Sequence, residues 1–177
     1  MIDIDKCRIT HYPDEVLAKT AGPVEKIDDN IRQLVEKMLD IMRANKGMGL
    51  AAPQAGVSLR LFIISMDGSK ENVRVYINPT VTPITAKGKS SFVENEEGCL
   101  SVPGIYTKIR RYRKCTVTAT DLLGNKFTEE AEGLYARCLQ HEYDHIEGTT
   151  IVNRMSATAK ITHRRQLKKL KEKHEKT

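Results

Sequence analysis

The pentapeptide His141-Glu142-Tyr143-Asp144-His145 carries more information than any other stretch of this chain. On an α-helix, residues four positions apart lie on the same face, so the two imidazoles can reach a single metal ion. Glu142 then lies beside that ion, where a carboxylate can move the protons of a metal-bound water. The pattern predicts a helix with two metal ligands, and the third ligand decides which class of enzyme this is.

The residues after His145 do not supply a third ligand. In one metalloprotease pattern, H-E-x-x-H-x-x-G-x-x-H, the last histidine would fall at Ile151, which cannot bind metal. Another protease pattern uses a downstream glutamate, but Glu147 is too close to turn back, and the later glutamates lie in a highly charged tail. The remaining candidates lie upstream. There, Glu97-Gly98-Cys99-Leu100-Ser101 places a cysteine beside an expected tight turn at Pro103-Gly104.

Length and composition indicate a single domain with a sizeable core, because the chain has 177 residues. No run approaches the ~18 apolar residues of a membrane span, so we expect no membrane association. The first six residues include two acids and no apolar stretch, which argues against a signal peptide. The four cysteines lack disulfide-framework spacing. A thiol as metal ligand then favours a reducing, cytoplasmic location.

The positive charge is concentrated at the C-terminus. Residues 154–177 contain nine Lys or Arg and two Glu, a net charge of +7. The other 153 residues contain twenty basic and twenty-one acidic side chains, a net charge of −1. Basic character is therefore expected of the tail and not of the body.

Apolar periodicity and capping residues predict three helices. Asp28 or Asp29 can cap a helix that continues through Ala44 and is ended by Gly47 or Gly49. A second helix is expected from about Gly133 to Glu147 and a third, basic helix from near Ser156. In the second helix one face is shared by Leu134, Cys138, His141 and His145.

Short runs rich in β-branched and aromatic residues predict strands at 61–64, 73–77, 115–119 and 126–128. The last two are expected to form a hairpin through a turn at 122–125. Strands followed by one ligand-bearing helix indicate an α+β domain, with mixed or antiparallel sheets packed around that helix. We expect a catalytic domain over residues 1–155 and a basic helical extension over 156–177.

Three segments resemble, in order and in spacing, the three motifs of peptide deformylases. They are Gly47-Met48-Gly49-Leu50-Ala51-Ala52-Pro53-Gln54, Glu97-Gly98-Cys99-Leu100-Ser101 and Gln140-His141-Glu142-Tyr143-Asp144-His145. The resemblance extends from about Ile9 to Met155. Each motif alone is moderately specific, whereas all three in order are very specific.

The resemblance implies that Cys99 is the third metal ligand, with His141 and His145. Such a set leaves a fourth position open, which is typical of catalytic rather than structural ions. The ligand types suit zinc or iron(II). The resemblance implies Fe2+ as the native ion, with Zn2+, Ni2+ or Co2+ able to replace it.

Similarity to deformylases also implies the reaction: hydrolysis of the N-formyl group from the initiator methionine of nascent peptides, with release of formate. Glu142 would transfer protons, while the Gln54 side-chain amide and the Leu100 backbone N–H would stabilise the oxyanion. The peptide is expected to pair as an extra strand beside Met48-Gly49 and beside the residues just after Cys99. The positions that match the family's substrate contacts are Met48, Gly49, Gly98, Leu134, Arg137 and Cys138. Arg137 could bury its stem there and keep its charge in water.

Some assignments stay open. Asp144 could accept the second N–H of a ligand imidazole, pair with Arg110 or Arg111, or be solvated. The tail could be a solvated helix or a contact to ribosomal RNA, which binds basic clusters through counterion release. A zinc endopeptidase and an RNA-binding module with a structural metal are the rival functions. The cysteine ligand argues against the first, and the near-neutral body and open fourth position argue against the second.

Overall fold

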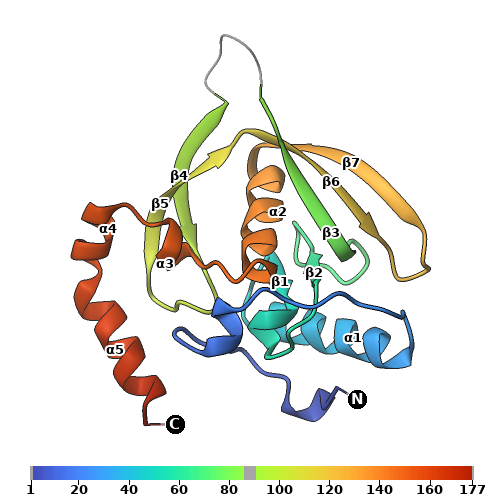
Figure 1. Ribbon diagram of the computed structural model, residues 1–177, viewed down its shortest axis with the longest axis horizontal. Coiled ribbons are helices and arrows are strands. Elements are labelled where there is room, and N and C mark those ends of the chain that lie inside the picture. The colour runs from blue at the N-terminus through green and yellow to red at the C-terminus, as the bar shows by residue number, and fades with distance from the viewer. Residues whose placement is uncertain (1, 86–90, 177) are drawn as a thin grey trace.

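The computed structural model describes residues 2–85 and 91–176 (Figure 1). The α-helices in this part of the chain are α1 (Asp29–Ala44), α2 (Gly133–Ile146), α3 (Ile151–Arg154), α4 (Ala157–Thr162) and α5 (Arg164–His174). The short 3-10 helices are η1 (Ile4–Lys6), η2 (Glu15–Ala18) and η3 (Ala52–Ala55). The strands are β1 (Gly49–Ala51), β2 (Leu61–Ile64), β3 (Arg74–Ile84), β4 (Phe92–Gly98), β5 (Tyr106–Tyr112), β6 (Lys114–Thr120) and β7 (Lys126–Glu132).

The strands form two antiparallel sheets. One has the order β1-β2-β3-β6-β7 and the other pairs β4 with β5. In Figure 1, α2 lies between the two sheets, and it contacts strands of both. β1 is the edge strand of the larger sheet, and β4 is paired on one side only among the described residues. The α+β class predicted from the sequence is confirmed.

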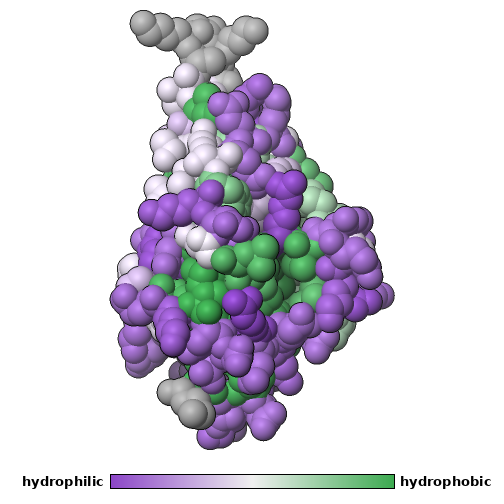
Figure 2. All heavy atoms as spheres, turned by 90° about the vertical axis from the view of Figure 1, so that its right-hand side faces the viewer, coloured by the Kyte–Doolittle hydropathy of each residue, from purple (hydrophilic) through white to green (hydrophobic). Residues whose placement is uncertain are grey.

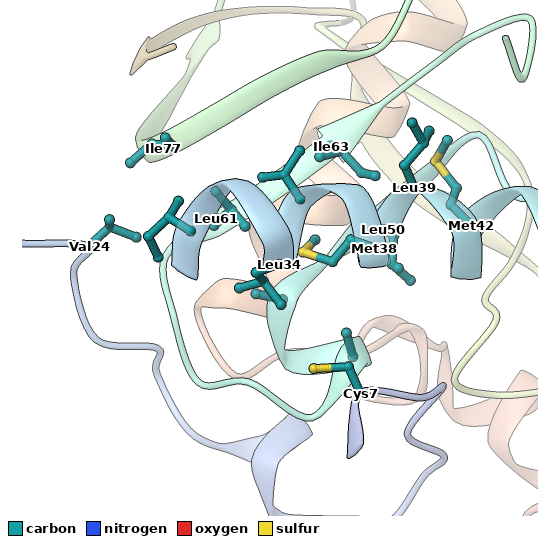
Figure 3. Close-up of a cluster of buried hydrophobic side chains, with 14 residues drawn as sticks. Cys7, Val24, Leu34, Met38, Leu39, Met42, Leu50, Leu61, Ile63 and Ile77 are labelled. Atoms are coloured by element: carbon teal, nitrogen blue, oxygen red, sulfur yellow. The ribbon is translucent and has the colours of Figure 1, made fainter. Parts of the chain in front are cut away.

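Helix α1 covers one side of the larger sheet (Figure 3). The Asp28 side chain caps it by accepting a hydrogen bond of 3.2 Å from the Ile31 amide, as predicted. Its apolar stripe is buried against β1 and β2, because side chains three and four positions apart face the same way. The prediction that a glycine ends α1 is wrong. The chain turns at Lys46, a non-glycine residue with φ of 54°.

The second apolar cluster joins α2 to the sheet. Leu139 and Ile146 of the helix pack with Phe62 and Tyr76 of the strands, and all four are buried. The predicted end of this helix at Glu147 is one residue too long, because Glu147 is its C-cap. The helix is thereby fixed on the sheet along most of its length, which limits how far its histidines can move.

The C-terminal tail folds back onto the body. It forms two helices instead of the single one expected, and Ser156 caps α4 through its side chain. Leu167 and Leu170 of α5 pack against a third cluster that includes the buried Val102 and Ile105. This packing holds α5 beside the segment that follows Cys99.

The sequence analysis missed β1, β4 and β5 and made two predicted strands too short. β3 continues from the predicted segment to Ile84, and β7 continues to Glu132. The predicted strands at 61–64 and 115–119 and the turn joining β6 to β7 are confirmed. The missed β4–β5 pair matters most, since β4 leads directly into Cys99.

Within the described part of the chain, an apolar hollow lies on the surface away from His141 and His145. Figure 2 looks at the side where α1 approaches the turn between β6 and β7, and apolar side chains gather there. The hollow has a volume of about 480 Å³ and is lined by residues that include Leu39, Val73, Leu122 and Phe127.

Among residues 2–85 and 91–176, none of the helices has the length and apolar character needed to cross a membrane.

Candidate metal centre and substrate groove

Three potential metal ligands converge from two elements. α2 supplies His141 and His145, and the turn after β4 supplies Cys99. One donor atom from each lies within 4.8 Å of the others, and the Cys99 Sγ is 3.3 Å from the His145 Nε2. A thiolate with two imidazoles suits zinc or iron(II). The predicted set therefore meets in space, and its chemistry fits one transition-metal ion.

Glu97 orients the first histidine. Its Oε2 lies 3.0 Å from the His141 Nδ1, which leaves the Nε2 to face the cluster. An imidazole ligand commonly donates its other N–H to a carboxylate, which fixes the ring and its tautomer. The sequence analysis missed this role of Glu97. The only available signal was its place two residues before the cysteine.

Asp144 does not contact either imidazole through a hydrogen bond in the described structure. It is buried and accepts hydrogen bonds from two arginines, Arg111 at 2.5 Å and Arg154 at 2.6 Å. Of the alternatives considered for Asp144, the ion pair with Arg111 is correct, and the solvated carboxylate is wrong. Arg154 was not foreseen as a partner.

The charges around the cluster are strongly coupled. Burial opposes ionisation of Glu97, but hydrogen bonds from His141 and Arg111 outweigh it and lower the pKa of this carboxyl to about 2. Burial, with His141 and Arg111 nearby, lowers the pKa of His145 well below its usual range. His145 is therefore neutral, as a ligand must be. Burial raises the pKa of Glu142 to about 7, which suits a group that exchanges protons near neutrality.

Glu142 lies next to the candidate ligand His141 and has one carboxylate oxygen without a hydrogen-bond partner among the described residues. It is 4% exposed, and its Oε2 has no hydrogen-bond partner among the described residues. A buried, unpaired carboxylate oxygen is costly, so it indicates a missing polar neighbour such as water or an ion. Gln54 is also buried, accepts a hydrogen bond of 2.8 Å from the Ala51 amide, and directs its Nε2 to the Cys99 Sγ at 3.5 Å. Its N–H groups thus point to the cluster.

A hollow of about 610 Å³ opens beside the cluster, between β1, β4 and α2. Every residue predicted to contact substrate lines it: Met48, Gly49, Gly98, Leu134, Arg137 and Cys138. Leu100, Gln54, Cys99, His141 and Glu142 also line it, so ligands and groove are continuous. The sequence analysis did not predict that Tyr106, which is exposed, also lines the groove. Its ring lies so close to Gly98 that an added Cβ would be 2.6 Å from the Tyr106 Cε1.

The prediction that Arg137 keeps its charge in water is wrong. The side chain is buried, and its guanidinium donates to the Glu97 Oε1 at 2.5 Å and to the Ile109 carbonyl at 3.0 Å. Cys138 is buried one position later and lines the groove as expected. Burial raises the pKa of its thiol to about 12, so it is present as the neutral form.

Known proteins are similar to this chain in sequence and in fold. A sequence model of the polypeptide deformylase family matches residues 6–160. A peptide deformylase of Neisseria gonorrhoeae is 42% identical over 166 residues, 94% of this chain and 96% of the relative. One from Pseudomonas aeruginosa is 40% identical over 161 residues, 91% of this chain and 94% of the relative.

Solved structures agree with the sequence comparison. A peptide deformylase from Legionella pneumophila superposes with a TM-score of 0.84 at 42% identity, covering 97% of this chain and 98% of that chain. A peptide deformylase from Plasmodium falciparum superposes with a TM-score of 0.89 at 34% identity, covering 96% of this chain and 98% of that chain.

Proposed function

We propose, because this chain belongs to the peptide deformylase family, that Cys99, His141 and His145 hold the metal ion of its active site. The family removes the N-formyl group from nascent peptides in a metal-dependent hydrolysis, and this chain is such a hydrolase. The observation that carries the ligand assignment is the convergence of three donor atoms within 4.8 Å beside an unpaired, buried carboxylate oxygen.

The ion we propose is Fe2+, with Zn2+, Ni2+ or Co2+ as substitutes. A thiolate and two neutral imidazoles accept any of these ions, so the preference for iron rests on similarity to the family. When bound, the metal acts as a Lewis acid that lowers the pKa of water and polarises the formyl oxygen. The Cys99 thiolate lies in a groove open to solvent, so a ferrous form should be sensitive to oxygen.

Glu142 is assigned the proton transfers. As a carboxylate it takes a proton from the attacking water, and as a carboxylic acid it gives that proton to the departing amine. Its raised pKa, about 7, supports both roles, because each protonation state is accessible near neutrality. With only 4% of the residue exposed, bulk water competes little for the proton.

Gln54 and Leu100 are assigned to the developing oxyanion. The Gln54 carbonyl oxygen is held by the Ala51 amide, so its NH2 group is fixed toward the ligand cluster before substrate arrives. Donors that are positioned in advance stabilise charge at the lowest reorganisation cost. The Leu100 backbone N–H is the second donor, and Leu100 lines the same groove.

The groove is assigned to the formyl-methionyl peptide, with α2 as the central helix that bears the ligands. The edge strand β1 and the strand β4 flank the hollow, so an extended peptide can add between them through backbone hydrogen bonds. Met48, Leu134 and Cys138 offer apolar surface for the methionine side chain, and Arg137 closes that end of the groove. Gly49 and Gly98 let the peptide backbone approach.

The division of the chain into a catalytic domain, 1–155, and a basic extension, 156–177, is also a proposal. The extension holds eight Lys or Arg and two Glu, which equals the net charge of +6 of the whole chain, and we infer that it contacts ribosomal RNA near the emerging peptide. Because formylated nascent chains exist where translation occurs, the enzyme would act in the cytoplasm. Sedimentation with ribosomes at low and moderate salt tests the contact, and equal sedimentation of full-length and truncated protein would contradict it.

The activity is tested with two peptides. Protein purified without oxygen should release formate from formyl-Met-Ala and should leave a blocked peptide with no formyl group intact. Cleavage inside the blocked peptide would instead favour a zinc endopeptidase. The variant Cys99→Ser should lose metal and activity together, because the substitution removes the soft sulfur ligand.

A further inference from the structure

We propose that Arg137 is a positioning residue that fixes the β4–β5 sheet to the ligand helix α2. One buried guanidinium would then hold both the wall of the substrate groove and the carboxylate behind His141. The inference rests on the ligand set assigned above, and it replaces the expectation that Arg137 serves mainly as a lining of the methionine pocket.

The contacts of Arg137 extend across both strands of the small sheet. From α2, its Nη2 donates to the Val93 carbonyl of β4 at 3.1 Å, and its Nη1 donates to the Ile109 carbonyl of β5 at 3.0 Å. A longer contact of 3.5 Å reaches the Asn95 carbonyl. The same Nη1 donates to the Glu97 Oε1 at 2.5 Å. Three backbone carbonyls and one carboxylate therefore converge on a single side chain.

Burial makes this arrangement specific for arginine. Arg137 is 5% exposed, so its charge depends on these acceptors and not on water. A guanidinium presents five N–H donors in a rigid planar fork, whereas a lysine ammonium has three donors on one atom. Lysine could still reach the Glu97 carboxylate, but it could not satisfy the carbonyls of both strands at once.

A second set of contacts between the small sheet and α2 lies on the same face of the helix. Arg111 of β5 bonds both oxygens of Glu97 at 3.0 Å and also donates to Asp144 of α2. Positions 137, 141 and 144 follow the spacing of one helix face. His141 therefore lies between two points at which the small sheet is held, and Glu97 connects to it at 3.0 Å.

The contacts of Arg137 and those of Arg111 have different consequences for the active site. Loss of the Arg137 contacts would remove the direct link from α2 to β4, the strand that leads to Glu97 and Gly98 in the groove, although Arg111 would still bond the Glu97 carboxylate. The Arg111–Asp144 contact would still hold β5. Arg137 should therefore affect peptide affinity through the wall, and His141 geometry through Glu97, without any direct contact to the metal.

The test uses Arg137→Met, which keeps an unbranched stem and removes the guanidinium with its charge, and Arg137→Lys, which keeps the charge and removes the fork. The control is Arg60→Met. Arg60 also contacts the C-terminal end of helix α2, through an ion pair of 2.7 Å with Glu147, but it does not line the groove. All four proteins are prepared with Co2+, and thermal unfolding, kcat and KM for formyl-Met-Ala, and the visible and near-ultraviolet cobalt spectrum are measured.

We expect Arg137→Met to raise KM roughly tenfold or more, as loss of charged hydrogen bonds allows, and to shift the cobalt bands that report the ligand geometry. Arg137→Lys should show a smaller rise in KM and a spectrum closer to wild type, because the contact to Glu97 is partly restored. Arg60→Met should keep wild-type KM and spectrum.

Wild-type KM and cobalt bands in Arg137→Met would overturn the proposal, even if thermal stability fell, because the role would then be structural only. If Arg137→Met does not fold, Arg137→Lys decides, and wild-type KM and bands in that variant would equally refute it. Failure of the ligand assignment is distinguishable, because the wild-type cobalt protein would then lack thiolate-to-metal absorption.

Discussion

Replacing Gly49 with alanine should disable Glu142 without touching any metal ligand. A Cβ at position 49 would lie 2.5 Å from the Glu142 Oε1, 2.9 Å from its Cδ and 3.0 Å from its Cγ. The φ angle of Gly49 is not in the left-handed region, so alanine fits its backbone. The effect of the substitution should therefore come from the new methyl group alone.

The size of the effect follows from the overlap. Ordinary contacts begin near 3.4 Å, so the carboxylate must retreat by roughly 1 Å. Gly49 pairs with Ile64 in the sheet, and Glu142 is buried in α2, so the flexible side-chain end gives way first. A misplacement of ~1 Å in a reacting group can cost ~10²-fold in rate. We expect kcat to fall by about that factor while metal content is unchanged.

The assay compares kcat on formyl-Met-Ala, metal content and thermal unfolding for Gly49→Ala and for Gly22→Ala. Gly22 is a matched control, because a Cβ there would meet only the Ser58 carbonyl oxygen at 3.7 Å, an ordinary contact. Its turnover should equal wild type. Wild-type turnover in Gly49→Ala would refute the placement of Glu142 against β1.

Three further outcomes are expected. Glu142→Gln should retain its metal and lose at least the ~10²-fold typical of general acid–base groups, and loss of metal instead would contradict its assigned role. Glu97 has a folded-state pKa of about 2, below its ordinary 4.5, so its contribution to the stability of metal-free protein should be complete above pH 4.5 and disappear as pH falls through about 2. Acid unfolding of Glu97→Gln should lack that component, and identical acid profiles would count against it. Deletion of residues 156–177 should preserve deformylation by folded protein at low temperature but lower the unfolding temperature, because Val102 and Ile105 lose the packing of Leu167 and Leu170; an unchanged unfolding temperature would mean that α5 does not stabilise the body.

The sequence predicted the elements whose apolar residues follow a clear period. α1 was placed by its stripe and by Asp28, and α2 by the spacing that brings His141 and His145 to one face. Local physics sufficed there, because helix geometry alone decides which residues are neighbours. Cys99 was different, since a contact over more than forty residues has no local signal and needed the resemblance to a family.

The small sheet could not be predicted from its pattern. In β5, alternate residues are buried, but one of these positions is Arg111, and in β4 the buried position is Glu97. An ion pair thus occupies sites where a strand pattern requires apolar residues, so both strands read as polar loops. The same two residues hold His141 and Asp144, which is why this departure from the pattern coincides with the active site.

Arg137 was misjudged for a related reason. A lone arginine on a helix is usually solvated at its charged end, and its carbonyl acceptors belong to strands that the sequence did not reveal. Gly49 shows the converse case. The sequence predicts it only as a substrate contact, and the structure adds a second reason for a glycine, the Glu142 side chain packed against it.

The central claim is that one metal held by Cys99, His141 and His145 makes this chain a deformylase. It is tested most directly by measuring formate release from formyl-Met-Ala, by protein purified without oxygen, while the metal is removed by a chelator and then restored as Fe2+. Activity should fall in proportion to the metal removed and return with about one equivalent per chain. Formate release that persists in metal-free protein would contradict the claim.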